Sequence, residues 1–534
     1  MSIRSSKHQG QTYIFIKKFK GVNIANSPWY VSEEDIGFLT VGTNVVFDRN
    51  GVLRTRYGLT QKTSNPLSSP IDCIHYFIYD KVNNKKQYLV TSGHKLYKVV
   101  QDASDWSFSL IGNLTGTNRP TIFSSEALFD GKAIIASGGR LQSYDYTNLE
   151  TITGVSLPDF TSNDGTLDDL SAQGTYTGTA DYTDYVVKID AKGSPDTFKW
   201  SDDGGDTWKA TGVAITGNWQ DLNNGIQIKF DNTTGHEVGD YWTFRAYYAP
   251  KAKWVIMQTA SLVISGDTDA PSYVYASGVG DETGWYVDNP VNWAKRIDTG
   301  NVIGLTSVGD YVIAFCRDPE EINLLDFVDC KLRQLVKGVS AINHYSIVTI
   351  GSFVFIIDND GIKQIALGRS TGKSRLSDPI GENFVSPDED HAFAFYYPPH
   401  AQLWFVLENS NYAWCYHVIH KTWTKLVFPV TITSAYYNPD AQELILGGSD
   451  GHLYLYDPDN FIESFDVEIT TKFFEADPLN EALYDVLEYT FEKLRPGTIT
   501  AYAVDELENE IEIGSTTFGG YGRGTYGSGN YGEG

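Results

Sequence analysis

Long apolar runs, helical patterning and methionine are scarce in this chain. No apolar stretch approaches the roughly 20 residues that a membrane-spanning helix requires, and no basic leader followed by an apolar run opens the sequence. Apolar residues rarely recur at the spacing of an amphipathic helix. Only 2 of the 534 residues are Met, against 50 Gly, 34 Tyr, 27 Phe and 12 Trp. We therefore expect a turn-rich, aromatic-rich, all-β protein that is made in the cytosol.

Metal-ligand and cofactor patterns are also missing. No two cysteines form a CxxC pair, and the ten histidines form no HxH or HxxxH motif. The sequence has no GxxxxGK(S/T) loop and no GxGxxG turn after a strand. We therefore expect no metal and no cofactor, and we interpret the cysteines as buried free thiols. They are Cys73, Cys316, Cys330 and Cys415.

Acidic residues outnumber Lys and Arg by 67 to 41, for a formal net charge of −26. The segment 1–32 is the exception, because its only charged residues are basic, whereas 463–513 is strongly acidic. We interpret 1–32 as either an arm that docks on an acidic partner or a solvated leader. Strong acidity argues against wrapping nucleic acid, but a channel lined with carboxylates would let a polyanion slide without sticking. The basic residues are Arg4, Lys7, Lys17, Lys18 and Lys20.

One pattern recurs through the chain: an apolar run, a turn centred on glycine, and a second apolar run. Most of these turns lie about 40 to 50 residues apart, or at twice that distance. Strand-like repeats of this length are typical of β-propeller blades, because one four-stranded sheet must stack on its neighbours to bury both faces. We therefore predict a propeller of six to eight blades. The turn glycines are Gly51, Gly93, Gly139, Gly309, Gly361 and Gly451.

The interval from Gly139 to Gly309 is too long for this repeat, and it contains a segment of different composition, 174–249. Removing the segment restores the spacing, with Gly266 as the missing turn. Alternating apolar residues and several aromatics predict that the segment is a small β-sandwich inserted in a loop. The alternating residues are Tyr185, Val187, Ile189, Ile226, Ile228 and Phe230.

These observations divide the chain into six parts. We expect the basic arm at 1–32, the two parts of the propeller at 33–173 and 250–462, and the inserted sandwich at 174–249. A further β-element is predicted at 463–513, where apolar residues alternate. The last part, 514–534, is a tail of mostly Gly, Tyr, Ser and Thr, which we expect to be mobile alone; that it orders against a neighbouring subunit is a hypothesis.

One local motif matches a known pattern closely. The residues 201–208, SDDGGDTW, fit the Asp-box S-x-D-x-G-x-T-W that recurs in sialidase propellers. In this motif the Asp side chain caps a tight hairpin turn and the Trp packs beneath it, so Asp203 and Trp208 are expected to be structural. A sialidase would repeat the box across several blades and would need an arginine cluster. A glycan-binding or glycan-cleaving propeller therefore remains the alternative function.

Other chemical interpretations are weaker. The acidic pair Glu320 and Glu321 and the run 388–390 lie beside prolines in expected loops, where exposed charge is ordinary. Calcium binding at 202–206, or at Asp358 and Asp360, competes with simple capping of turns, which we favour. We therefore predict no catalytic residues and expect that the protein is not an enzyme.

The opening of the chain resembles that of tail nozzle, or packaged-DNA stabilization, proteins of short-tailed bacteriophages. The similarity lies in FKGVN at 19–23 and in NVVFDRNGVLRTRYG at 44–58, with Tyr57 where such proteins often have proline. It continues in 271–293, 341–365 and 518–534. The matching residues of the opening are Phe19, Gly21, Asn23, Asn44, Gly51, Leu53, Arg56 and Gly58.

The resemblance implies a structural virion protein of the phage tail. It implies a homo-oligomeric ring, commonly a hexamer, that attaches below the portal and adaptor and closes or extends the channel through which the genome leaves. The DNA would pass without specific binding. The inserted sandwich is similar to Ig-like domains of phage structural proteins, which would make it available to tail-fibre proteins or to a host surface glycan.

Overall fold

The computed structural model describes residues 19–25, 37–102, 105–285, 293–297, 300–367, 372–460, 463–471, 489–491, 497–504, 510–518 and 524–526. Almost all regular structure in these ranges is β-strand. The helical elements there are four short 3-10 turns, η1 (Phe129–Gly131), η2 (His344–Ser346), η3 (Asp378–Asn383) and η4 (Pro398–His400). None of the helices among the described residues is long and apolar enough to cross a membrane.

Seven four-stranded antiparallel units account for most of the described strands. Blade 1 contains β5 (Cys73–Asp80), β6 (Lys85–Ser92), β7 (Lys95–Gln101) and β8 (Trp106–Asn113). Blade 2 contains β9 (Thr121–Ser124), β10 (Ala133–Ala136), β11 (Gln142–Tyr144) and β12 (Leu149–Thr151). Blade 3 contains β22 (Trp254–Gln258), β23 (Ser261–Ser265), β24 (Tyr273–Ala276) and β25 (Trp293–Arg296). Blade 4 contains β26 (Asn301–Val308), β27 (Tyr311–Arg317), β28 (Glu321–Asp326) and β29 (Leu332–Lys337).

Blades 5, 6 and 7 come from the C-terminal half of the chain, except for one strand of blade 7. Blade 5 contains β30 (Ile347–Ile350), β31 (Phe353–Asp358), β32 (Gly361–Ala366) and β33 (Gly372–Arg375). Blade 6 contains β34 (Phe393–Tyr397), β35 (Gln402–Val406), β36 (Tyr412–His417) and β37 (Thr422–Val427). Blade 7 contains β38 (Ile432–Asn438), β39 (Glu443–Gly448) and β40 (Leu453–Asp457), and its outer strand is the N-terminal β4 (Gly58–Gln61).

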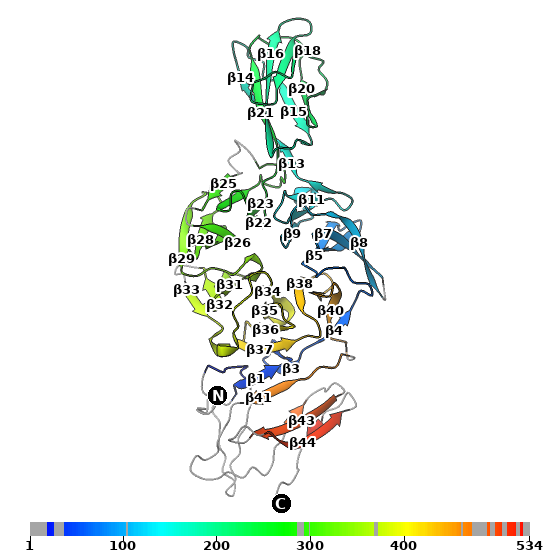
Figure 1. The fold of residues 1–534 in the computed structure, drawn as a ribbon, viewed down its shortest axis with the longest axis vertical. Coiled ribbons are helices and arrows are strands. Elements are labelled where there is room, and N and C mark those ends of the chain that lie inside the picture. The colour runs from blue at the N-terminus through cyan, green and yellow to red at the C-terminus, as the bar shows by residue number, and fades with distance from the viewer. Residues whose placement is uncertain are drawn as a thin grey trace, which may run out of the picture.

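The blades form a closed ring (Figure 1). Their first strands contact one another in the order β5, β9, β22, β26, β30, β34 and β38, and β38 contacts β5. The core lies between blades, so the inner strands are apolar on both faces, as in the fully buried β23 and β35. Because β4 pairs with β40, the two ends of the chain close the ring together. The predicted all-β propeller is confirmed, with seven blades in the described residues.

Glycine turns join the second and third strands in several blades, and they explain the sequence repeat. Gly93 and His94 both have positive φ, at 55° and 63°, between β6 and β7, as a type I′ turn requires. Gly139 and Gly451 lie at equivalent turns, and Gly361 directly follows one as the first residue of β32. In blade 4 the equivalent turn contains Asp318 and Pro319, and Gly309 instead joins the first and second strands. The glycine that marks blade 4 in the sequence repeat therefore lies in a different turn from the glycines that mark the other blades.

Gly51 does not lie in a blade turn, contrary to the prediction from the glycine repeat. It lies between β2 (Val45–Phe47) and β3 (Leu53–Thr55), which form a two-stranded ribbon outside the blades. The backbone still requires glycine there, since φ is 81°. The interval from Gly51 to Gly93 therefore does not span one blade, although its length fits the repeat.

The inserted module is a sandwich of two sheets between blades 2 and 3. One sheet contains β13 (Thr153–Val155), β14 (Asp159–Thr161), β16 (Tyr182–Ala191), β17 (Thr197–Ser201), β18 (Ala210–Ala214) and β21 (Tyr241–Tyr248). The other contains β15 (Leu170–Gly174), β19 (Gln220–Asp221) and β20 (Ile226–Phe230). The alternating apolar residues predicted to form its core are buried. The predicted start at 174 is too late, because β13, β14 and β15 precede it and pair with β20 and β21.

The sandwich is anchored to the ring by side chains at the end of its last strand, β21, and by Asp181. Arg140 of blade 2 lies over the Tyr248 ring, 3.6 Å from its centroid, and its Nη2 contacts Asp181 Oδ1 at 3.1 Å. The Tyr247 hydroxyl donates to the Thr283 carbonyl at 2.9 Å. These contacts hold the module at one end of the long axis, opposite the C-terminal strands (Figure 1).

The terminal segments extend blade 6. Strand β1 (Leu39–Thr43) pairs in parallel with β37 and antiparallel with β41 (Glu468–Thr471), so the sheet of blade 6 has six strands. The other C-terminal strands form two pairs, β43 (Gly497–Val504) with β44 (Glu510–Phe518) and β42 (Tyr489–Phe491) with β45 (Gly524–Tyr526). The predicted boundary at 513 falls inside β44 and is wrong. The arm residues 1–18 and 26–32, and most of the predicted tail, lie outside the described residues.

Candidate functional site

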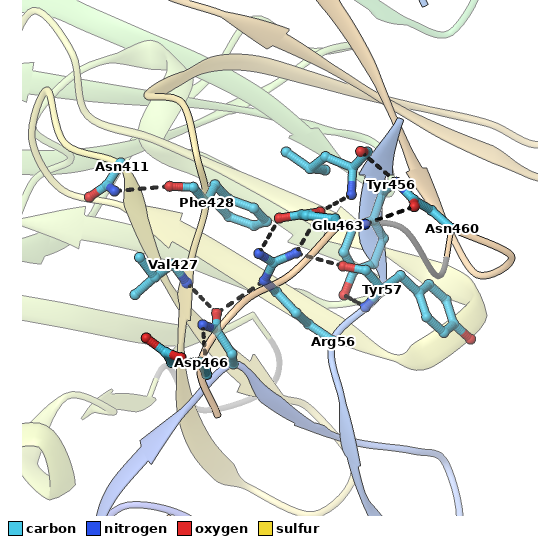
Figure 2. A network of polar contacts seen from close by, with 11 residues as sticks. Arg56, Tyr57, Asn411, Val427, Phe428, Tyr456, Asn460, Glu463 and Asp466 are labelled. Carbon is cyan, nitrogen blue, oxygen red and sulfur yellow. Dashed lines mark hydrogen bonds and ion pairs between the residues drawn. The ribbon is translucent and has the colours of Figure 1, made fainter. Parts of the chain in front are cut away.

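The residues that carry the resemblance gather where the N-terminal segment meets blades 6 and 7. Arg56 is the centre of this group, and its side chain is only 1% exposed. Its Nη2 lies 2.7 Å from Glu463 Oε1, and its Nη1 donates to the Tyr57 carbonyl at 2.7 Å. The guanidinium lies over the Phe465 ring, 3.9 Å from the centroid. Figure 2 shows that the contacts surround the guanidinium, which satisfies a buried cation.

Asn44 connects three separate segments through one amide. Its Oδ1 accepts from Arg56 Nε at 3.0 Å and from the Val427 amide at 2.8 Å, while its Nδ2 donates to the Asp466 carbonyl at 2.7 Å. Its backbone has a φ of 57°, a left-handed conformation that asparagine tolerates better than most residues. The residue therefore ties the corner between β1 and β2 to blade 6 and to the C-terminal segment.

Gly58 begins the closing strand β4 and leaves little room for a side chain. A Cβ atom there would lie 3.0 Å from Cγ and from the carbonyl oxygen of Asn460. Asn460 Nδ2 donates to the Leu59 carbonyl at 2.7 Å, and the Glu463 carboxylate accepts from the Leu59 amide. We call Asn44, Arg56, Gly58, Asn460 and Glu463 the closure clasp, because they attach the closing strand to the chain that follows blade 7.

The first motif element, residues 19–23, lies against the outer strand of blade 6. The Val22 amide donates to the Trp423 carbonyl at 2.8 Å, and the Asn23 amide donates to the Leu39 carbonyl at 2.9 Å. Phe19 packs on the cluster that contains Trp423. The residues of this motif element therefore contact blade 6 and β1 and stabilise the ring.

Gly21 is expected to tolerate no side chain. Its φ is 81°, and an added Cβ would lie 2.8 Å from the Trp423 amide nitrogen and from Thr422 Cβ. We expect Gly21→Ala to lower the free energy of unfolding by about 2 kcal/mol or more, since the left-handed conformation alone costs roughly 1–2 kcal/mol. Thermal unfolding would measure this. Gly204→Ala is the control, because Gly204 has a similar φ of 74° but nothing within 4 Å of an added Cβ. Equal effects of the two substitutions would show that the close packing at Gly21 contributes nothing.

Side chains fill the axis of the ring. Arg119 Nε donates to the Asp72 carbonyl at 3.0 Å and Nη2 to the Thr433 carbonyl at 2.8 Å, linking blades 1, 2 and 7. The guanidinium lies 4.3 Å from the centroid of Tyr345 and 5.2 Å from that of Phe393. The hollow beside them measures about 290 Å³, the size of a small-ligand cavity. A nucleic acid duplex therefore cannot pass along the axis of this propeller.

The axis also contains imidazoles that are uncharged at neutral pH. Burial lowers the pKa of His75 to about 4. Burial, together with the charge of Arg119, lowers the pKa of His344 to about 3. Burial raises the pKa of the Cys73 thiol to about 12. These groups are hydrogen-bonded or stacked, with His75 Nε2 2.7 Å from Ser124 Oγ and His344 stacked on Trp254.

The Asp-box caps the hairpin between β17 and β18. Asp203 Oδ1 accepts from Ser201 Oγ at 2.5 Å and from the Thr207 amide at 2.9 Å. The hydrogen bonds from Ser201 and Thr207 hold the pKa of Asp203 well below its usual range. Trp208 is only partly buried and lies under Lys199 Nζ, 4.1 Å from the ammonium nitrogen. Asp203 thus acts as predicted, whereas Trp208 packs on the surface of the sandwich.

Most of the other acidic candidates are engaged in local ion pairs or hydrogen bonds. Glu321 differs from the expectation of an exposed loop residue, because it begins β28, is buried, and has a carboxylate oxygen without a hydrogen-bond partner. Lys363 Nζ contacts both Asp358 and Asp360, at 2.5 and 2.6 Å. Glu389 pairs with Arg317 at 2.7 Å, and Asp388 with His391 at 2.6 Å. Asp202 pairs with Lys209, and Glu320 accepts from Asn359. Among the described residues no group of three or more His, Cys, Asp or Glu is placed to hold a metal ion.

Cys316 and Cys415 are buried and Cys73 and Cys330 partly buried, and all four are free. The interpretation as buried thiols therefore holds in full for two of them. A larger hollow, of about 660 Å³, lies between blades 6 and 7. Sequence reasoning missed it, because its lining comes from six separate segments and no local pattern marks it.

No family model and no curated protein matches this chain. Among solved structures, the chain is similar to the crystal structure of the computationally designed Ika8 protein, with 10% sequence identity and a TM-score of 0.37. The similarity covers 74% of this chain and 99% of that chain. A similarity of this size carries no functional information, and the fold assignment rests on the strand pairing within the chain itself.

Proposed function

We propose that this chain is a structural subunit of the tail of a short-tailed bacteriophage, where copies of it form a ring, commonly a hexamer, that extends or closes the DNA exit channel. The observation that carries the proposal is the convergence of the motif residues. Asn44, Arg56 and Gly58 meet in the closure clasp, and Gly21 braces blade 6 beside them. A motif that serves the closure of one particular ring is more specific to a family than separate turn glycines.

The blocked axis refines this proposal. Because Arg119, Tyr345 and Phe393 fill the centre of the propeller, DNA would pass between subunits, through a channel that the assembled ring encloses. The net charge of −26 suits such a passage, since carboxylates repel the phosphate backbone. The portal and adaptor would bind one end of the ring, and the anchored sandwich would be available to tail-fibre proteins or a host glycan. The protein would act in the virion, after synthesis in the host cytoplasm, without catalysis.

Assembly is the direct test of this proposal. We expect the purified protein, alone or mixed with its portal and adaptor, to give ring-shaped particles with a central hole in negative-stain images. Their mass should be a multiple of 59.4 kDa, six-fold for a hexamer. Monomers that persist at high concentration in the presence of both partners would contradict the proposal. Release of reducing ends from host polysaccharide would instead support the glycan-cleaving alternative, for which the single Asp-box is the only specific indication.

A further inference from the structure

The hollow between blades 6 and 7 is lined by aromatic rings and by charges of mostly one sign. Four tyrosines line it, two of them buried, with prolines from the turn η4 and from the end of β40. Its volume of about 660 Å³ is that of an ordinary ligand site. The tyrosines are Tyr57, Tyr397, Tyr437 and Tyr456.

Two carboxylates in this lining form no ion pair within 4 Å among the described residues. Glu443 is the first residue of β39 and Asp457 is the last residue of β40. Because these two strands are antiparallel neighbours, both residues lie at the same end of the strands. Neither forms an ion pair among the described residues, and Glu443 has no side-chain hydrogen bond there either. Burial raises the pKa of Glu443, the nearby charge of Lys62 opposes this shift only in part, and the charge of Asp457 adds to it. Like charges on neighbouring strands destabilise a sheet, so a bound cation would reduce the repulsion between Glu443 and Asp457.

The cations in the lining do not neutralise these acids. Arg49 is exposed, and its guanidinium donates to the carbonyls of Pro398 and Pro399 at 2.6 and 2.8 Å. Burial lowers the pKa of His400, which is therefore uncharged at pH 7, and its Nε2 lies 3.1 Å from the Tyr57 hydroxyl. With Asp459 at the rim, three carboxylates face one arginine. Carboxylates beside tyrosine rings suit an ammonium or guanidinium group.

The sequence supplies a segment of matching charge close to this hollow. Residues 1–18 contain four Lys and Arg residues and no acidic residue. The described residues begin at Phe19, and Gly21 lies against Thr422. Two residues before Thr422, the His420 ring contacts the carbonyl of Arg49, which lines the hollow. A segment of 18 residues spans up to about 60 Å when extended, so it can reach the hollow of its own chain or of a neighbour.

We propose that the hollow between blades 6 and 7 binds the basic N-terminal segment of this protein, with Lys or Arg side chains held by Glu443 and Asp457 among the tyrosine rings. The binding does not depend on the proposed role in a phage tail, because it requires only the propeller and the segment. In an assembled ring the same contact would join neighbouring subunits.

Zero-length carbodiimide cross-linking of the full-length protein, read by mass spectrometry, tests the proposal. We expect amide bonds between lysines of the segment, Lys7, Lys17 or Lys18, and the hollow acids Glu443, Asp457 or Asp459. Mixing isotope-labelled and unlabelled protein distinguishes links within one chain from links between chains, and either result supports the proposal. Links from these lysines mainly to acids outside the hollow would overturn it.

A charge-neutral variant gives an independent readout. In the double variant Glu443→Gln/Asp457→Asn, the yield of cross-links from the segment to Asp459 should fall about fivefold or more. This is the loss of binding that corresponds to one modest ion pair. The control is Glu150→Gln, which removes an exposed acid on blade 2. The double variant should fold, since it removes two repelling charges, and a thermal midpoint equal to or above that of the unchanged protein would establish this. An unchanged yield of links to Asp459 in a folded double variant would contradict the proposal.

Discussion

Replacing Arg56 by Met is expected to lower the free energy of unfolding of the propeller by about 3–5 kcal/mol. The substitution leaves the Glu463 carboxylate, whose side chain is 13% exposed, without its cation, and removing one partner of a buried ion pair has this cost. It also removes the hydrogen bonds to Asn44 and to the Tyr57 carbonyl. Calorimetry should show the loss in the transition of the propeller, with that of the sandwich unchanged.

Arg54→Met provides the matched control two residues away. Arg54 pairs with Asp48 at 2.8 Å, but its side chain is 62% exposed, so the expected loss is below about 1 kcal/mol. Glu463→Gln should cost about as much as Arg56→Met, and the double variant should cost less than the sum of the two, because the residues form one network. Similar losses for Arg54→Met and Arg56→Met would contradict the importance of the clasp.

Replacing His236 by Leu is expected to destabilise the sandwich by about 3–5 kcal/mol, with the propeller unaffected. His236 is fully buried, and its two ring nitrogens lie 3.1 Å from carboxylate oxygens of Asp169 and Asp196. Both ring nitrogens therefore have a buried carboxylate as their hydrogen-bond partner. The variant would leave two buried carboxylates without their imidazole hydrogen-bond partner, which is costly for charged groups. Thermal unfolding followed by the fluorescence of the sandwich tryptophans would measure the loss.

The pH dependence of this effect has a defined direction. Burial raises the pKa of Asp196, but hydrogen bonds from the amides of Gly193 and His236 and from the imidazole outweigh it, so the pKa lies below the ordinary value of 3.8. The stability that Asp196 contributes is therefore present above about pH 4 and is lost as the pH falls through its folded pKa. The deficit of His236→Leu should shrink over the same range. The control is His391→Leu, because His391 and its partner Asp388 are both exposed; an equal loss there would contradict the explanation.

The candidate site was only partly predictable from sequence. The motif residues were identified from their resemblance, but nothing local indicated that Arg56 would bind Glu463, 407 positions away. The acids of the hollow between blades 6 and 7 were not identified at all. Glu443 and Asp457 belong to different strands, and Tyr57 and Tyr397 are 340 residues apart, so only the closure of the ring brings them together.

The boundary errors have a related cause. Strands β13 and β14 have three residues each, too few for alternation to be recognised, and both depend on pairing with the distant β21. The turn at Gly51 has the backbone and the spacing of a blade turn, yet β2 and β3 form a separate ribbon. Local turn chemistry specifies a hairpin, but the partners of the hairpin are decided elsewhere in the chain.

By itself the sequence determined the all-β class, the repeated hairpins and the inserted sandwich, because turn glycines and the alternation of apolar residues act within a few residues. The number of blades, the closure of blade 7 by β4, the filled axis and the closure clasp were decided only by the tertiary structure. Each of these depends on residues hundreds of positions apart, whose contacts form once neighbouring blades bury their apolar faces against one another.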